Sequence, residues 1–230
     1  MYVEPAYIIC MPVAIFVSSE AKRGDICMEF FLPSSCSTMV RCLCVMDSIG
    51  KTAGAGASRQ YWKDAKNVLR QNHNMDLDVK FLPGAGLHEL CEQAIGVDDT
   101  YDYQLLLSFA NDLVTQAGQN VQWSKWQVIK PRMLAALGQL SDHWRGRAHE
   151  IVFGGIGDMW EIPKPEIFNE RVIEILHGGQ NLNLSMRPAS EWLQQLKGKP
   201  WKGFHFDPQF RQMAVNWLVE NIVCTCRPSH

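Results

Sequence analysis

The sequence lacks a marked excess of charge of either sign. Its 22 Lys and Arg residues stand against 24 Asp and Glu residues, which leaves a formal net charge of −2 at pH 7. Proteins that bind nucleic acids usually present a basic face, so this balance argues against a nucleic-acid partner. Runs of like charge are also short, which argues against charged tails or arms.

The sequence also lacks an apolar run of membrane-spanning length. The segment at 7–17, YIICMPVAIFV, is shorter than the roughly 20 residues that a spanning helix needs, and Pro12 interrupts it. No basic residue precedes it, so a buried strand or an irregular extension is favoured over a signal peptide. We therefore expect no stable membrane span, and a cytoplasmic location is favoured.

None of the eight cysteines belongs to a C-x-x-C pair, which argues against a structural zinc site. A chain of 230 residues does not need a disulfide framework to fold, so we expect mostly reduced, buried thiols. Cys42 and Cys44 should point to the same face of a strand, because side chains alternate there.

Apolar strand-like runs alternate with helix-like stretches from residue 41 onward. The expected strands are 42–46, 77–82, 103–108, 150–153 and 182–185, and the expected helices are 59–71, 88–95, 125–144, 166–176 and 189–196. Alternation of this kind predicts a three-layer α/β/α sandwich with a flavodoxin-like, mostly parallel five-stranded sheet. Residues 41–230 should form this domain, and residues 1–40 an N-terminal extension of uncertain structure.

A final helix is expected at about 208–222. Pro208 suits its first turn, and Asp207 is a candidate N-cap. The apolar stripe that should pack on the sheet consists of Met213, Ala214, Trp217 and Leu218.

Polar and small residues follow several expected strands, namely Ser48, Gly86, Asn111 and Gly155. In a parallel α/β sheet, functional sites gather at the carboxyl ends of the strands. His205 lies far away in sequence, just before the final helix. A serine nucleophile and a histidine base can meet only if the fold brings both to one sheet edge.

Four motifs occur in order along the chain: MDS at 46–48, LPGAG at 82–86, FAND at 109–112 and KGFH at 202–205. They resemble the G-D-S, glycine, G-x-N-D and D-x-x-H blocks of the SGNH (GDSL-type) hydrolases. This resemblance covers roughly residues 41–222. It implies a serine esterase that acts on a small-molecule ester (an acyl ester, a lipid or an acetylated sugar) without a metal or organic cofactor.

The resemblance also implies residue roles. Ser48 would attack an ester carbonyl, and His205 would take the serine proton and return it to the leaving alcohol. The oxyanion hole would consist of the backbone N–H of Ser48, the backbone N–H of Gly86 or Gly84, and the side-chain amide of Asn111. Trp160 and Trp201 are candidates to line a substrate pocket. Asp47 and Asp112 are interpreted as structural residues that bind loop backbone.

Three positions depart from the family pattern. Met46 and Phe109 replace glycines and would reshape the pocket. Lys202 stands where the family has the acid that orients the histidine, and a lysine cannot accept the imidazole N–H. Its charge would also disfavour the imidazolium that forms during catalysis.

Three interpretations of this departure follow. His205 could work in a dyad, oriented by a backbone carbonyl. Another carboxylate, Asp207 or Asp158, could reach the ring and serve as the triad acid. The third alternative is a non-catalytic SGNH-like ligand-binding protein that has lost the triad acid.

A rival interpretation arises from the same loop. Residues 48–52, SIGKT, imitate the end of a phosphate-binding P-loop. The full motif needs a glycine five residues before Gly50, where this chain has Val45 inside a strand. Without that glycine the loop cannot wrap phosphates through successive N–H groups, so nucleotide binding is disfavoured.

Overall fold

The apolar runs form a five-stranded parallel sheet in the computed structural model, which describes residues 38–54, 59–97, 100–109, 111–114, 125–155, 162, 164–196 and 201–226. The strands are β1 (Val40–Met46), β2 (Met75–Phe81), β3 (Tyr103–Ser108), β4 (His149–Phe153) and β5 (Met186–Pro188). Their order is β2-β1-β3-β4-β5, and every neighbouring pair is parallel. This is the flavodoxin-like order that the sequence predicted.

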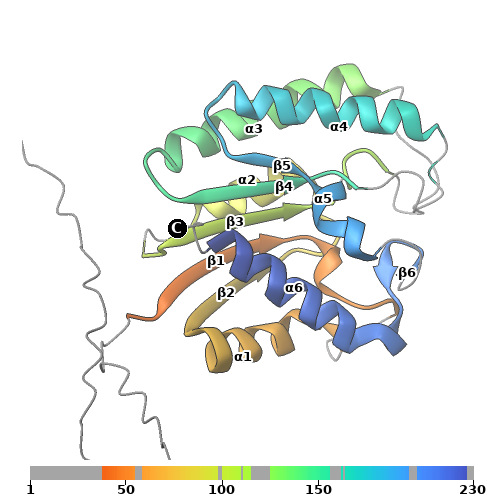
Figure 1. The fold of residues 1–230 in the computed structure, drawn as a ribbon. Helices are drawn as coiled ribbons and strands as arrows, with labels where there is room; N and C mark the ends of the chain where they lie inside the picture. Colours follow the sequence, from red (N-terminus) through yellow and green to blue (C-terminus); the bar gives the residue numbers. More distant parts are fainter. Residues whose placement is uncertain are drawn as a thin grey trace, which may run out of the picture. The chain divides into compact units, whose positions relative to one another are not determined.

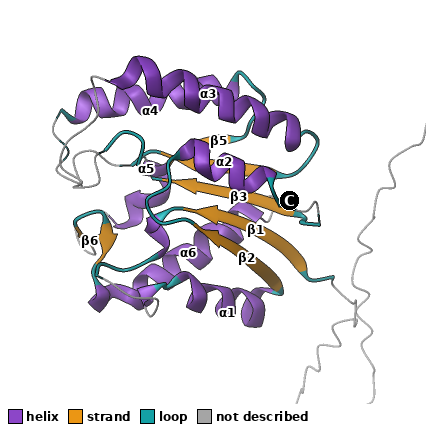
Figure 2. Ribbon diagram, turned by 180° about the vertical axis from the view of Figure 1, so that it is seen from behind, coloured by secondary structure: helices purple, strands orange, loops and turns teal. Residues whose placement is uncertain are grey.

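Helices cover both faces of the sheet (Figures 1 and 2). They are α1 (Trp62–His73), α2 (Leu87–Ile95), α3 (Trp126–His143), α4 (Pro165–Gln180), α5 (Ala189–Leu193) and α6 (Arg211–Cys226). In Figure 1 α6 crosses in front of the sheet and α2 lies behind it. α1 packs against α6, whereas α2 packs against α3 and α3 against α4. The predicted three-layer α/β/α sandwich is therefore confirmed.

Strand β1 lies in the interior of the sheet, and its residues from Cys42 to Met46 are all buried. A parallel strand covered by helices on both faces has no solvent side, which explains its unbroken apolar sequence. The matching run in β3, from Gln104 to Ser108, is buried as well. These two strands carry the segments of Ser48 and Asn111 at their carboxyl ends.

The prediction of a strand at 182–185 is wrong. Leu182 and Asn183 lie in the turn after α4, where their N–H groups donate to Gly179 O and Gln180 O, and residues 184–185 lead from this turn into the next strand. Asn183 has a φ of 60°, a left-handed conformation that asparagine tolerates. The fifth strand is instead the short β5, whose Pro188 is acceptable because β5 lies at the sheet edge.

The end of the chain contains a small hairpin and the final helix. Strands β6 (Trp201–Lys202) and β7 (His205–Phe206) pair antiparallel. The 3-10 turn η5 (Pro208–Phe210) follows and leads into α6. Asp207 caps this turn as predicted, since its carboxylate accepts from Gln209 N at 3.0 Å.

Ala214, Trp217 and Leu218 of α6 are buried as predicted. Met213 is 41% exposed, so its predicted place in the packed stripe is wrong. Most of residues 1–40, the predicted extension, lies outside the described residues.

Candidate active site

The carboxyl ends of β1, β2 and β3 are tied together by backbone hydrogen bonds. Leu82 N donates to Met46 O at 2.9 Å, and Asp47 N donates to Leu107 O at 3.2 Å. Parallel neighbours end at the same edge of a sheet, so three of the four motifs meet there. The short 3-10 turn η1 (Ser48–Gly50) begins directly after β1 and carries Ser48, which is half-buried.

Asp47 is the fully buried centre of this edge. Its Oδ1 accepts from Ile49 N at 2.9 Å, which caps η1. Its Oδ2 accepts from Phe109 N at 2.6 Å and from Asn111 Nδ2 at 3.1 Å. The carboxylate thus joins the turn of Ser48 to the loop after β3, and its predicted structural role is confirmed.

Burial raises the pKa of Asp47 to about 7, although the N–H groups of Ile49 and Phe109 act in the opposite direction. The nearby Asp112 carboxylate adds to this increase. Asp47 therefore changes charge near neutral pH while it holds two loops of the candidate site.

Asp112 joins a second pair of loops. Its Oδ2 accepts from Leu87 N at 2.6 Å, at the start of α2. A Cβ atom at Gly86 would overlap this carboxylate, which explains why glycine occupies that position. Bonding to loop backbone was the predicted role of Asp112, and the structure confirms it.

The predicted oxyanion donors at Gly86 and Asn111 have protein acceptors in this structure. Gly86 N donates to Glu89 Oε2 at 2.7 Å in a capping box. Asn111 Nδ2 donates to Ala85 O at 2.9 Å as well as to Asp47. An oxyanion could use these donors only after an existing bond is exchanged, so their role stays a prediction.

A shallow hollow of about 360 Å³ lies beside these donors. It is lined by Leu82, Pro83, Gly84, Ala85 and Glu89. Gly84, the other candidate donor, adopts a φ of +84° that suits glycine. Glu89 was not singled out in the sequence, because a glutamate three residues after a helix N-cap has an ordinary capping role.

The hairpin that carries His205 packs against the turn of Ser48. Thr52 forms an isolated parallel bridge with Phe206, and Ala53 N donates to Phe206 O at 2.7 Å. Strand β7 also contacts η1. Residues 157 positions apart in sequence thus come from adjoining segments, as the predicted nucleophile and base require.

His205 lies in a setting that opposes a positive charge. Burial, and then the charge of Lys51, lower the pKa of the ring from 6.5 to about 4. The ring atom Nε2 is buried and has no hydrogen-bond partner among the described residues. An unpaired buried nitrogen of this kind is uncommon, and it means that Ser48 Oγ does not donate to this atom in the structure.

The acid that should orient His205 is not found in the described part of the chain. Asp207 caps η5, and no hydrogen bond or ion pair joins its carboxylate to the ring. The structure therefore does not bring this candidate triad acid to His205. Asp158, the other candidate, lies outside the described residues.

Lys202 is exposed in β6, and it is Lys51 whose charge lowers the pKa of His205. Lys202 was the cation predicted to act on the ring, and the effect of Lys51 was not predicted. The G-K-T pattern was the available signal, because it places a lysine three residues after Ser48.

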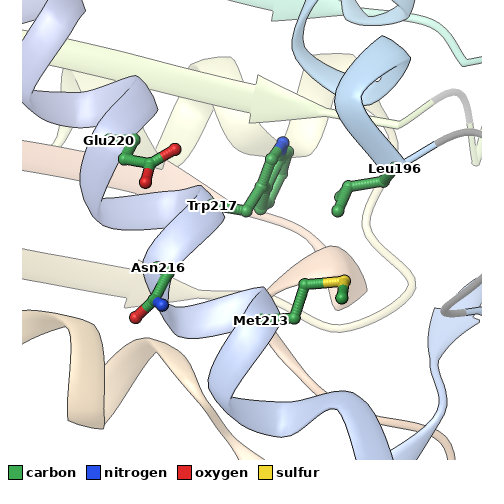
Figure 3. A pocket seen from close by; sticks show the side chains of 5 residues that line it. All are labelled: Leu196, Met213, Asn216, Trp217 and Glu220. Atoms are coloured by element: carbon green, nitrogen blue, oxygen red, sulfur yellow. The ribbon is translucent and has the colours of Figure 1, made fainter.

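A second hollow, of about 430 Å³, lies between α6 and the 3-10 turn η4 (Gln194–Leu196) (Figure 3). It is lined by Leu196, Met213, Asn216, Trp217 and Glu220. None of the residues predicted to act in catalysis is among them. The hollow explains the exposure of Met213, whose side chain points toward Leu196 in Figure 3.

Of the two tryptophans predicted to line a substrate pocket, the structure describes only Trp201. Trp201 is half-buried and stacks on Phe206 with ring centroids 4.5 Å apart. It therefore supports the hairpin of His205, and its predicted contact with substrate stays untested. Trp160 lies outside the described residues.

Several solved structures with the same architecture are named as esterases or acylhydrolases. The lipase/acylhydrolase from Enterococcus faecalis is 12% identical, with 84% of this chain and 100% of that one covered and a TM-score of 0.57. The psychrotrophic esterase EstA from Pseudoalteromonas sp. is 10% identical, with 80% and 97% covered and a TM-score of 0.56. A Clostridium thermocellum family 3 carbohydrate esterase is 14% identical, with 82% and 97% covered and a TM-score of 0.53.

The chain shares its α/β/α fold with these esterases and with the acylhydrolase. At these identities the likeness establishes the fold alone. No family model and no curated protein matches the sequence. Within the described part of the chain, no helix combines the length and the apolar character that a bilayer crossing requires.

Proposed function

We propose that the protein is a serine esterase that hydrolyses small carboxylic esters through an acyl-serine intermediate. The observation that carries the proposal is the junction between two distant segments. The turn of Ser48 and the hairpin of His205 are joined through Thr52, Ala53 and Phe206 at the carboxyl edge of an SGNH-type sheet. The esterases and acylhydrolases with the same fold support the reaction class.

In the proposed mechanism, Ser48 Oγ attacks the ester carbonyl while Nε2 of His205 accepts the hydroxyl proton. The tetrahedral intermediate collapses, and His205 returns the proton to the leaving alcohol. Water then attacks the acyl-serine with His205 again as the base, which releases the carboxylic acid and restores Ser48. With a pKa of about 4, His205 is neutral at pH 7 and can accept a proton.

Oxyanion stabilisation would come from Ser48 N–H, Gly86 N–H and the Asn111 amide. Substrate binding would have to release Gly86 N–H from Glu89, and one Asn111 N–H from Asp47 or Ala85 O. The low pKa of His205 makes it a weak base, and no described carboxylate supports its protonated form. We therefore expect slow turnover for a serine esterase.

The test is hydrolysis of p-nitrophenyl acetate by the wild type, Ser48→Ala and His205→Ala. Activity in the wild type that is lost in both variants supports the esterase. The alternative, a ligand-binding protein without turnover, is motivated by Lys202 and by the absence of an acid beside His205 among the described residues. It predicts no activity in the wild type with acetyl or longer acyl esters.

A further inference from the structure

Two cysteines from opposite ends of the fold touch each other. The Sγ atoms of Cys42, in β1, and Cys226, the last residue of α6, are 3.7 Å apart. Figure 1 shows the end of α6 in front of the sheet near the start of β1. To form a disulfide, the two sulfur atoms would have to approach each other from this distance to about 2.05 Å.

The two thiols differ in their access to solvent. Cys42 is fully buried, whereas Cys226 is half-buried at the helix end. A reagent can therefore reach Cys226 first, and Cys42 is already beside it. Cys44 is also fully buried on the same face of β1, and Cys224 is exposed two positions before Cys226.

We propose that Cys42 and Cys226 are an oxidative modification site, which forms an intramolecular disulfide when the protein meets a small-molecule disulfide such as oxidised glutathione. The thiolate of Cys226 attacks the small disulfide, which gives a mixed disulfide and releases one small thiol. The thiolate of Cys42 then attacks the Cys226 sulfur and releases the second small thiol. The two protein thiols are oxidised, and the small disulfide takes up their two electrons and two protons.

The second step should be slow at neutral pH. Contact with Cys226, and then burial, hold the pKa of the Cys42 thiol well above its ordinary value, and the thiolate is the nucleophile. We therefore expect faster formation at pH 8.5 than at pH 7. The finished bond would link positions 184 residues apart, and closing so long a loop restricts the unfolded chain strongly. The oxidised protein should unfold at a higher temperature.

The experiment uses the full chain because both thiols belong to one folded unit. Trypsin would leave Cys42 and Cys44 on peptide 42–51, and Cys224 and Cys226 on peptide 212–230, because it does not cleave the bond between Arg227 and Pro228. The double variant Cys44→Ala/Cys224→Ala therefore keeps one cysteine on each peptide. This variant and the wild type are incubated with oxidised glutathione, their free thiols are alkylated, and they are digested without reduction.

The expected result is a cross-linked pair of these two peptides from the double variant and from the wild type, lost on reduction. Cys226→Ala should lose both the cross-link and the rise in Tm, whereas its matched control Cys224→Ala should keep both. The absence of a cross-link at pH 8.5 would overturn the proposal. So would a cross-link that joins Cys226 to Cys10, Cys27, Cys36 or Cys44, or one that forms only in denatured protein.

Discussion

Lys202 and His205 are Cα partners across the two-residue turn between β6 and β7. Side chains directly opposite each other on antiparallel strands lie on the same face and within reach of each other. The turn is possible because Gly203 adopts a φ of +63°, which hairpin turns of this length favour. Lys202 thus stands opposite His205, at the position where the family resemblance has the acid that orients the histidine.

Lys202→Asp should therefore raise the activity of the esterase. A carboxylate opposite His205 can accept the imidazole N–H and stabilise the imidazolium, so both the pKa of the ring and kcat should rise. Loss of the triad acid lowers turnover by about 10⁴ in a serine protease, so a gain of roughly tenfold or more is expected here. Lys202→Asn is the matched control, because it removes the same charge without adding an acid. An equal gain in both variants would contradict the orienting role.

The pH dependence of kcat/KM should report the low pKa of His205. The acidic limb of the profile, where kcat/KM rises as the ring becomes neutral, should lie at a pH of about 4. An ordinary histidine would place this limb near pH 6.5. In Lys51→Gln the limb should move toward higher pH but stay below 6.5, because burial, the larger cause, is unchanged. Lys80→Gln, an exposed site on β2, is the control and should leave the limb in place. A wild-type profile that does not rise near pH 4 would show that the ring is not in this setting, whereas a further change near pH 7 would be assigned to Asp47.

Asp47→Asn should lower both stability and turnover. Asparagine turns one accepting oxygen into an NH₂ group, which must then face either Ile49 N or the donors of Phe109 and Asn111. A buried donor left without an acceptor costs about 1–3 kcal/mol, which urea unfolding can measure. The control Asp142→Asn changes a largely exposed carboxylate and should have little effect. Wild-type stability in Asp47→Asn would contradict the central place of this carboxylate.

Asn111→Ala should reduce kcat by about 100-fold or more with little change in KM, since an oxyanion donor acts in the transition state. Asn111 also binds Asp47 and Ala85 O, so the free energy of unfolding is measured beside the kinetics. Asn67→Ala, at an exposed position of α1, controls for the loss of an amide. A change confined to KM, or a stability loss that accounts for the whole effect, would argue against the oxyanion role.

The sheet could be predicted from sequence because each central strand is buried on both faces and reads as an unbroken apolar run, as in β1 and β3. The edge strand β5 could not, because Met186, Arg187 and Pro188 are not typical of a buried strand. The motifs predicted which segments meet, since the ends of parallel strands share one edge of the sheet.

The partners of the candidate site residues could not be predicted in the same way. The effect of Lys51 on His205, the bond from Gly86 N to Glu89 and the contact between Cys42 and Cys226 depend on how loops and helix ends pack. No local periodicity encodes them. Asp47 is an intermediate case, because its position in the motif indicated a structural role but not its partners.

The most direct test of the central claim is covalent labelling of the native protein with a fluorophosphonate, read by intact mass and peptide mapping. The account predicts one adduct per chain at Ser48, slower labelling in His205→Ala and none in Ser48→Ala. A wild-type protein that stays unlabelled, or one labelled at another residue, would contradict the assignment of Ser48 as the nucleophile.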